Sequence, residues 1–372
     1  MIRHRPTVAL IDLDAVRHNV GEFRRGGVEV MAVVKANGYG HGALPVARAA
    51  LAAGATWLGV SMVEEGVQLR DAGIAAPILV LSEFPRGSEK EALAAGLTPS
   101  LYTEEGLARL AEAAGSFGGD AVVHVKVDTG MHRVGLPPER APAFVQSVLG
   151  AGLELQGLWT HFATSEELDD EFTDVQLGRF RGTVERLKAA GVRPEYLHAA
   201  NTAAALARPE TRLDMVRVGL GVYGLLPAPA LSAMADLRPA MAWRSAVTMT
   251  KRVQAGEAIS YGQRYRLDRE ATIATVPVGY ADGYSRTMGD AAVVLIRGRR
   301  YRVAGTVTMD QVMVDCGDDP VEVGDEVCLL GRQGGEELAA DDLAGWMGTI
   351  NYEVVCMVSG RVPREYLGGE WA

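Results

Sequence analysis

The chain has 372 residues, of which 48% are hydrophobic and 23% are charged, and its formal net charge at pH 7 is −10. At roughly 150 residues per domain, this length predicts two domains, or one barrel with a smaller domain. Nucleic acids and anionic membrane surfaces favour clustered positive charge, so the acidic balance argues against both as partners. The three cysteines form no CxxC motif, which argues against a disulfide scaffold and a cysteine-based zinc site.

The first residues, MIRHRPTVALIDLD, reach the acidic Asp12 without an apolar segment or a small-residue cleavage site. They therefore do not resemble a secretory signal. No run of 18 apolar residues occurs in the sequence, so we expect no membrane-spanning helix. These features predict a soluble protein located in the cytoplasm.

Short β-rich segments alternate with alanine-rich helical segments from residue 13 to about 225, and several helical segments end in glycine, as helix C-termini prefer. Eight segments are predicted as strands: 28–35, 56–61, 77–82, 97–102, 122–128, 154–162, 195–201 and 215–220. Eight strand–helix units in a chain segment of this length favour a (β/α)8 TIM barrel. A doubly wound parallel sheet is the alternative.

The pattern changes after Pro227, where strand-like segments bounded by Gly and Asp begin to follow one another. These segments cover residues 243–253, 271–280, 292–303, 306–315 and 325–331, with short helical segments near 340–347 and 351–358. The sequence thus predicts an α/β protein, with an N-terminal barrel over residues 11–232 and a mostly antiparallel β domain over 233–372.

In a TIM barrel, polar residues at the carboxyl ends of the strands form the active site. The residues predicted to lie there carry mainly cationic, imidazole, amide and hydroxyl groups: Lys35, Lys126, Asp128, Arg133, His161, His198, Asn201, Thr202 and Arg217. Such a cationic rim in an acidic protein favours an anionic ligand. The histidines form no HExxH motif and no metal site is expected, and the absence of GxSxG leaves hydrolase chemistry without support.

Lys35 follows the apolar residues MAVV and precedes a glycine-rich stretch, NGYGHG. A desolvated lysine amine has a lowered pKa and can form a Schiff base with a carbonyl compound. The alternative is an ordinary lysine at a strand end, whose amine reaches solvent.

The segment 219–224 fits GxGxxG, a pattern that can mark a dinucleotide site. Pro227 and Pro229 follow at once, so the crossover helix of a Rossmann unit cannot start there. The same segment suits a phosphate-binding loop, in which Thr202 and the backbone of Gly219 and Leu220 would contact the phosphate.

The chain resembles bacterial alanine racemases from about Thr7 to Val362. The motifs that carry the resemblance occur in this order: VVKANGYGHG, VKVDTGMHRVG, THFA, HAANTAA, VRVGLGVYG, ISYGQRY, PVGYADGYSR, TMDQVMVD and NYEVVC. The resemblance implies a pyridoxal 5′-phosphate cofactor and a homodimer with shared active sites, in which the N-terminal strand (residues 1–10) joins the β domain. It also implies interconversion of L- and D-alanine, which supplies D-alanine for peptidoglycan synthesis.

The resemblance assigns roles to individual residues of this chain. Lys35 would hold the cofactor as an aldimine and act as one catalytic base, and Tyr261 of the partner subunit would be the opposite base. Arg217 would face the pyridine nitrogen, and His161 would bridge Arg217 and Tyr261. Further cofactor-binding positions would be Tyr39, Arg133, Asn201, Thr202, Gly219, Leu220 and Tyr352. Substrate-binding positions would be Arg133, Met309, Asp310 and Tyr280, with Lys126, carbamylated in many relatives, supporting Arg133.

The sequence departs from the family at Gly38, where Ala is common, at Thr202, where Ser is frequent, and at Thr306, where many relatives have Arg near the substrate entrance. Thr306 leaves the substrate size open, so a racemase of serine, lysine or a broad set of amino acids remains an alternative. Two other classes are a non-catalytic pyridoxal-phosphate carrier and a cofactor-free Schiff-base aldolase. A β domain with Tyr261 argues against the carrier, and Arg217 argues against the aldolase.

Overall fold

The computed structural model describes residues 4–117 and 121–368, which divide into two compact units. One unit, the barrel unit, consists of Ala15–Gly38 and Ala43–Arg238. The other, the β unit, consists of the described residues up to Asp14, the short segment Tyr39–Gly42 and the described residues from Pro239 onward. Three separate segments of the sequence therefore contribute to the β unit.

The barrel unit contains one sheet of parallel strands, ordered β8-β7-β6-β5-β4-β3-β2-β9. Its strands are β2 (Glu29–Val33), β3 (Trp57–Val60), β4 (Ile78–Val80), β5 (Thr98–Leu101), β6 (Val122–Lys126), β7 (Glu154–Trp159), β8 (Tyr196–His198) and β9 (Met215–Val218). Backbone hydrogen bonds close the sheet between its end strands, from Asp214 N to Leu197 O at 3.0 Å and from Arg217 N to Ala200 O at 2.9 Å. Each of the eight predicted strand segments contains one of these strands, so the predicted barrel is confirmed.

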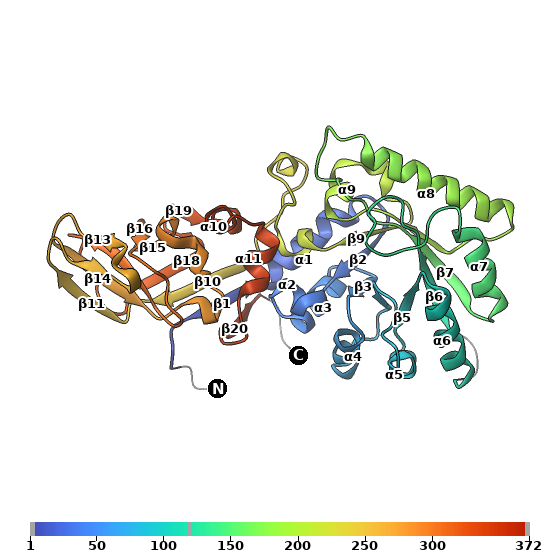
Figure 1. The fold of residues 1–372 in the computed structure, drawn as a ribbon, viewed down its shortest axis with the longest axis horizontal. Coiled ribbons are helices and arrows are strands. Elements are labelled where there is room, and N and C mark those ends of the chain that lie inside the picture. Colours follow the sequence, from blue (N-terminus) through green and yellow to red (C-terminus); the bar gives the residue numbers. More distant parts are fainter. Residues whose placement is uncertain (1–3, 118–120, 369–372) are drawn as a thin grey trace. The chain divides into compact units, whose positions relative to one another are not determined.

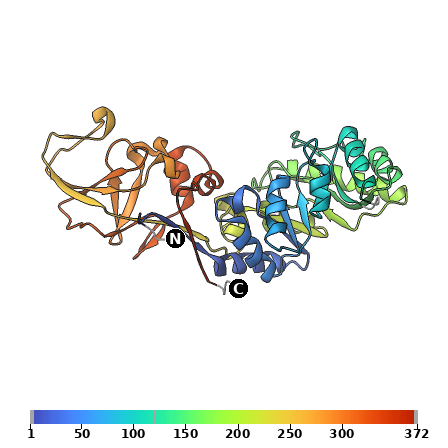
Figure 2. The ribbon, with the colours of Figure 1, turned by 90° about the horizontal axis from the view of Figure 1, so that it is seen from below.

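Most helical segments of the barrel unit lie on the outer side of its strands (Figure 1, Figure 2). The helical segments are α1 (Leu13–Arg24), α2 (Lys35–Tyr39), α3 (Ala43–Ala52), α4 (Val63–Asp71), α5 (Glu89–Ala94), α6 (Glu104–Gly115), α7 (Ala141–Gly150), α8 (Phe172–Ala189) and α9 (Thr202–Ala207), with 3-10 turns η1 (Pro209–Thr211), η2 (Leu220–Tyr223) and η3 (Pro229–Leu231). Helix α6 shows why such segments fold: Thr103 caps it by accepting the Gly106 N–H at 2.9 Å, and Leu107, Leu110 and Ala114 form a buried stripe.

Several strands of the barrel are buried along their whole length because both of their faces are covered. In β3, β4, β5 and β9 every residue is buried. A cluster of Met31, Trp57, Leu79 and Met215 forms part of this core.

The β unit is built on a mostly antiparallel sheet, ordered β11-β14-β17-β16-β15-β18-β10-β1-β20, with β19 paired to β18. Its strands are β1 (Val8–Asp12), β10 (Met241–Ala246), β11 (Met249–Val253), β14 (Ala271–Val276), β15 (Val293–Ile296), β16 (Arg299–Val303), β17 (Val312–Gly317), β18 (Glu326–Gln333), β19 (Glu336–Leu338) and β20 (Arg364–Leu367). The N-terminal strand β1 pairs antiparallel with β10 and parallel with β20. The predicted fold class, a TIM barrel with a mostly antiparallel β domain, is confirmed.

Further short elements complete the β unit. They are the hairpin strands β12 (Ala258–Ile259) and β13 (Tyr265–Arg266), the 3-10 turns η4 (Tyr261–Gln263), η5 (Tyr280–Asp282) and η6 (Arg286–Ala291), and the helices α10 (Ala340–Met347) and α11 (Asn351–Met357). The two helices coincide with the helical segments expected near 340–347 and 351–358. Strand β10 alternates buried and half-buried residues, as a strand with one face on a core does.

Gly40 and Gly73 provide a matched test of close backbone packing. Both have a positive φ, 81° and 84°, but a Cβ at Gly40 would lie 2.2 Å from the Val355 carbonyl oxygen, whereas one at Gly73 would meet nothing within 4 Å. Gly73→Ala is expected to lose about 1–2 kcal/mol of unfolding free energy through its φ alone. Gly40→Ala should lose about 1–3 kcal/mol more, because the α11 backbone must move. Urea unfolding of both variants measures this difference, and equal losses would contradict it.

Candidate active site

The carboxyl ends of the barrel strands bring together four of the predicted cationic residues. Lys35 follows β2, Lys126 ends β6, Arg133 lies in the loop after β6, and Arg217 lies in β9. All four positive charges act on the half-buried His161 imidazole, which follows β7, and together with desolvation they hold its pKa well below the ordinary value. The structure therefore gathers these side chains around His161, as the sequence predicts for a barrel active site.

The chain turns sharply after Lys35. Ala36, Asn37 and Gly38 have φ values of 51°, 53° and 60°, all in the left-handed region that non-glycine residues rarely adopt. The Glu65 carboxylate stabilises this turn by accepting the Ala36 N–H at 2.6 Å. Lys35 thus lies at a constrained corner between a buried strand and a left-handed turn.

The Arg217 guanidinium is buried and surrounded by hydrogen-bond acceptors. Its Nη2 donates to the carbonyl oxygens of Thr160 at 2.7 Å and Ala199 at 2.9 Å, and it lies 3.2 Å from Nδ1 of His161. Its Nη1 lies 3.2 Å from Nδ1 of His198. Burial lowers the pKa of Arg217 to about 9, so the group stays charged at neutral pH.

His161 and His198 act as neutral acceptors for this guanidinium. Burial, followed by the Arg217 charge, lowers the pKa of both imidazoles well below the ordinary value. An arginine has only donors, so the His161 Nδ1 that faces it must be the unprotonated nitrogen. The proton of His161 is therefore on Nε2, where it can be donated to another group.

Lys126 and Arg217 share one aromatic ring. Lys126 Nζ lies 4.3 Å from the centre of the Trp159 ring, and the Arg217 guanidinium carbon lies 4.7 Å from it. Burial, followed by the charges of Arg217 and Arg133, lowers the pKa of Lys126 to about 7. A large share of Lys126 is therefore the neutral, nucleophilic amine at neutral pH. The sequence analysis did not identify Trp159 as the ring that contacts both cations. The position of Trp159, two residues before His161, is the signal that could have identified it.

Thr202 lies where the predicted phosphate-binding loop meets helix α9. Its Oγ1 accepts the N–H groups of Gly219 at 3.2 Å and Gly221 at 3.3 Å, and Leu220 begins the turn η2 between them. Asn201 caps α9 by accepting the Ala204 N–H at 3.0 Å. The hydroxyl and these backbone N–H groups gather at one place, as an anion-binding site needs.

The remaining predicted site residues belong to the β unit: Tyr39, Tyr261, Tyr280, Met309, Asp310 and Tyr352. Tyr39 is buried, and its ring centre lies 6.3 Å from that of Tyr352 on α11. Burial, followed by the neighbouring Tyr352, raises the pKa of Tyr39. These two tyrosines therefore form a pair within the β unit.

Tyr261 is fixed through its backbone while its side chain is exposed. Thr306 Oγ1 donates to the Tyr261 carbonyl at 2.9 Å, and Ser260 Oγ donates to the Thr306 carbonyl at 2.7 Å. The Tyr261 side chain is 72% exposed. The threonine at position 306, noted as a departure from the family, thus positions the backbone of a predicted catalytic residue.

Tyr280 and Met309 lie on neighbouring backbone segments. The Tyr280 N–H donates to the Thr308 carbonyl at 3.0 Å, and a Cβ at Gly279 would lie 2.3 Å from the carbonyl oxygens of Thr308 and Met309, so only glycine fits there. Tyr280 is 42% and Met309 51% exposed. Together with Tyr261 they form a set of large exposed side chains in the β unit. Asp310 next to them is paired with Arg361 at 2.8 Å.

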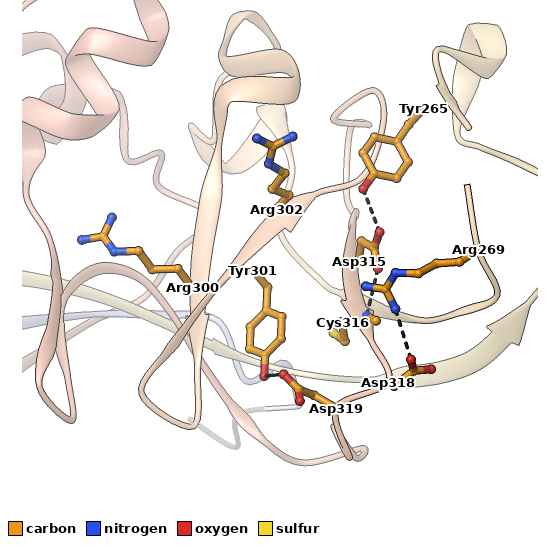
Figure 3. Close-up of a pocket in the computed structure, with 10 residues that line it drawn as sticks. Tyr265, Arg269, Arg300, Tyr301, Arg302, Asp315, Cys316, Asp318 and Asp319 are labelled. Atoms are coloured by element: carbon orange, nitrogen blue, oxygen red, sulfur yellow. Dashed lines mark hydrogen bonds and ion pairs between the residues drawn. The ribbon is translucent and has the colours of Figure 1, made fainter. Parts of the chain in front are cut away.

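A hollow of the β unit contains none of the predicted site residues (Figure 3). Its three carboxylates are already engaged by neighbours: Tyr265 donates to Asp315 at 2.8 Å, Tyr301 donates to Asp319 at 2.8 Å, and Arg269 lies 3.2 Å from Asp318. Three arginines, Arg269, Arg300 and Arg302, also line the hollow and match the three carboxylates in charge, and we assign it no chemistry. Within residues 4–117 and 121–368, no group of three or more His, Cys, Asp or Glu could hold a metal ion, and no helix has the length and apolar character needed to cross a membrane.

Comparisons with known proteins place the chain in a family. Residues 11–227 match the family model described as alanine racemase, N-terminal domain, and residues 240–366 match the model for the C-terminal domain. A protein of Symbiobacterium thermophilum named alanine racemase is 50% identical over 372 residues, which cover 99% of this chain and 98% of the relative. The chain belongs to the alanine racemase family. It is therefore an enzyme of the isomerase class, and the resemblance found in the sequence is confirmed.

Solved structures of alanine racemase family enzymes and their relatives have the same fold. The crystal structure of alanine racemase from the D-cycloserine producer Streptomyces lavendulae has a TM-score of 0.95 and 41% identity, and covers 100% of this chain and 99% of that one. Histidine racemase from Leuconostoc mesenteroides subsp. sake has a TM-score of 0.91 and 31% identity, with 99% of both chains covered. The fold is thus shared by racemases that are named for different amino acids.

The lowered pKa of Lys126 predicts that the free energy of unfolding depends on pH. Its pKa falls from 10.5 to about 7 on folding, so the unfolded chain binds more protons between these values, and the unfolding free energy should rise with pH from about 7 to 10. Lys126→Met should remove this rise, whereas Lys90→Met, at an exposed lysine of α5, should retain it. Urea unfolding of the cofactor-free protein at pH 7, 8 and 9, in buffer free of bicarbonate, measures the slopes. A Lys126→Met slope equal to that of the unmodified protein would contradict the assignment.

Proposed function

We propose that this enzyme interconverts L- and D-alanine with pyridoxal 5′-phosphate as its cofactor, and that it supplies D-alanine for peptidoglycan synthesis in the cytoplasm. The observation that carries the proposal is the grouping of Lys35, the buried Arg217 and the Thr202 hydroxyl on one barrel, all of them gathered at or near the carboxyl ends of its strands.

The residues present fit the three functional parts of this cofactor. Lys35 would offer an amine for the aldehyde, and Arg217 would offer N–H donors for the ring nitrogen. The Thr202 O–H and the Leu220 N–H would offer donors for the phosphate, beside the Gly219 N–H, which donates to Thr202 Oγ1 here. Tyr39 and Tyr352 would contribute to phosphate binding, and Asn201 and Arg133 would complete the set. When bound, the cofactor supplies an electron sink that acidifies the α-proton of an amino acid.

Arg217 favours simple return of the proton over other reactions. A guanidinium donates a hydrogen bond but does not readily give up its proton, so the ring nitrogen that it faces would remain unprotonated. By donating without releasing its proton, Arg217 would keep the electron-withdrawing power of the bound ring moderate. Arg217 would thereby favour racemisation over transamination.

Racemisation needs a base on each face of the α-carbon, because a single base returns the proton to the side from which it came. Lys35 would serve one face and Tyr261 of the partner subunit the other. The Nε2 proton of His161 is free to be donated to the Tyr261 oxygen, which would stabilise the phenolate form. Arg217 would thereby act on the second base through His161.

A homodimer accounts for the exposed residues of the β unit. Tyr261, Tyr280 and Met309 are large side chains exposed close to predicted substrate-binding positions, and such exposed groups mark interaction sites. In the proposed dimer they cover the barrel site of the partner, where Met309, Asp310 and Tyr280 help to bind the substrate. Each active site would then combine Lys35 of one chain with Tyr261 of the other.

Lys126 is proposed to be carbamylated. The neutral amine attacks carbon dioxide, forms an N–C bond and releases a proton, which leaves a carboxylate on the former amine. The lowered pKa of Lys126 provides the neutral form near pH 7, and the charges of Arg217 and Arg133 favour the resulting anion. The carbamate would support Arg133, which would bind the carboxylate of the substrate.

Substrate identity and the role of Lys35 are tested together by a chiral assay of D/L interconversion over the twenty amino acids. Alanine is expected to be the fastest substrate, with serine slower, and Lys35→Ala should abolish turnover. Borohydride reduction of the protein incubated with pyridoxal 5′-phosphate should attach the cofactor to the peptide that contains Lys35. Faster turnover of another amino acid would favour the alternative of a different racemase, and label on another lysine would exclude the role of Lys35.

The shared active site is tested by mixing two inactive variants, Lys35→Ala and Tyr261→Phe. Subunit exchange forms heterodimers in which one of the two sites contains both Lys35 and Tyr261, so activity should return to about half of that of a native dimer per heterodimer formed. A Lys35→Ala/Tyr261→Phe double variant mixed with Lys35→Ala is the matched control and should stay inactive. Absence of recovery, with exchange confirmed by mass spectrometry, would mean that each protomer is self-contained.

A further inference from the structure

A chain of buried polar side chains leads away from Arg217 through the interior of the barrel. Arg217 Nη1 lies 3.2 Å from Nδ1 of His198 in β8, and His198 Nε2 lies 2.9 Å from Nδ1 of His124 in β6. Both imidazoles are fully buried. Strand β7 separates β6 from β8 in the sheet, so the contact between His124 and His198 passes across β7.

Arg217, the first residue of this hydrogen-bonded series, determines which atom donates and which accepts in each hydrogen bond. Arg217 can only donate, so His198 Nδ1 accepts, and the proton of the neutral His198 must be on Nε2. His198 Nε2 therefore donates to His124 Nδ1, which places the His124 proton on Nε2. The tautomers of two histidines are thus fixed by one guanidinium.

Gln156, near the start of β7, supplies the next acceptor. Its Nε2 donates to the exposed Glu195 carboxylate at 3.2 Å, which leaves its Oε1 as the free end of the amide. Among the described residues, both this Oε1 and His124 Nε2 are buried atoms without a hydrogen-bond partner. The Gln156 side chain nevertheless interacts with the imidazole and acts to raise the His124 pKa, as an acceptor does. The two atoms are complementary, a donor and an acceptor.

The barrel is shaped around these imidazoles. A Cβ at Gly157 would lie 2.3 Å from His124 Nδ1, so a strand residue larger than glycine would displace the ring. Trp57 lies against His124, with ring centres 5.2 Å apart, and Trp159 stacks on His198 at 5.7 Å. Aromatic walls offer the imidazoles few other acceptors, so Gln156 Oε1 is the acceptor that would satisfy His124 Nε2 at the end of the Arg217–His198–His124 series.

We propose that His124 and Gln156 are positioning residues that fix, through His198, the orientation of the Arg217 guanidinium, with Glu195 as the anchor of the chain. The proposal deepens the proposed function, since it rests on Arg217 facing the ring nitrogen of the cofactor. An amide does not accept and pass on protons as an imidazole does, so the chain orients Arg217 and does not conduct protons to Glu195.

Nitrogen NMR of the cofactor-free protein labelled with ¹⁵N-histidine tests the chain directly. His124 and His198, assigned from His124→Asn and His198→Asn spectra, should each show a protonated Nε2 and an unprotonated Nδ1. Gln156→Leu, or the shorter Gln156→Asn if the first variant fails to fold, should keep both tautomers, which Arg217 sets, but shift the His124 and His198 signals. Glu154→Gln, at the start of the same strand, should change neither, and Gln156→Glu combined with Glu195→Gln should restore the native pattern.

The role in positioning Arg217 is tested in the same variants with the cofactor bound. Gln156→Leu should lower kcat for alanine by about 10-fold or more, the effect typical of losing an outer partner of a site residue, while KM stays within about twofold. The absorbance spectrum of the bound cofactor should shift in Gln156→Leu and not in Glu154→Gln. Unshifted His124 and His198 signals in Gln156→Leu, or shifted signals with unchanged kcat and spectrum, would overturn the proposal. Failure of the unmodified protein to bind the cofactor would instead contradict the proposed function and leave the NMR result standing.

Discussion

The buried charge of Arg217 is the constraint on which the rest of the barrel site depends. A guanidinium removed from water must be hydrogen-bonded and shielded, or it destabilises the fold by several kcal/mol. The backbone carbonyls of Thr160 and Ala199, at the ends of β7 and β8, supply two acceptors, and the neutral imidazoles of His161 and His198 supply two more. Each of these acceptors is positioned by the strand that carries it, so the closed barrel is what makes the buried charge tolerable.

The same charge determines the protonation of its neighbours. After burial it is the largest influence that lowers the pKa values of His161, His198 and Lys126. It therefore keeps two imidazoles neutral and makes the Lys126 amine partly neutral near pH 7. In the proposed mechanism this allows His161 to donate to a tyrosine oxygen and Lys126 to react with carbon dioxide, so one buried cation prepares both groups for their roles.

The sequence predicts the barrel well because each strand is a local apolar segment with a recognisable end. It predicts the identity of the site residues mainly through the resemblance, since Lys35 or His161 alone is compatible with an ordinary strand-end residue. The sequence does not predict contacts between segments that are far apart along the chain. No local pattern indicates that His124 reaches His198 across the interior, that Thr306 holds the Tyr261 backbone, or that the left-handed turn at Ala36 is stabilised by Glu65. Such contacts depend on which strands and loops the closed fold brings together.

The most direct test of the two-base account is the wash-in of solvent deuterium at the α-carbon under single-turnover conditions in Tyr261→Phe. If Lys35 and Tyr261 serve opposite faces, D-alanine should still exchange its α-proton through Lys35, while L-alanine should exchange more slowly by about 10²–10⁴-fold, the usual effect of losing a positioned acid–base group. The unmodified protein should exchange both enantiomers. Equal exchange of the two enantiomers in Tyr261→Phe would contradict the account and transfer the role of second base to another group.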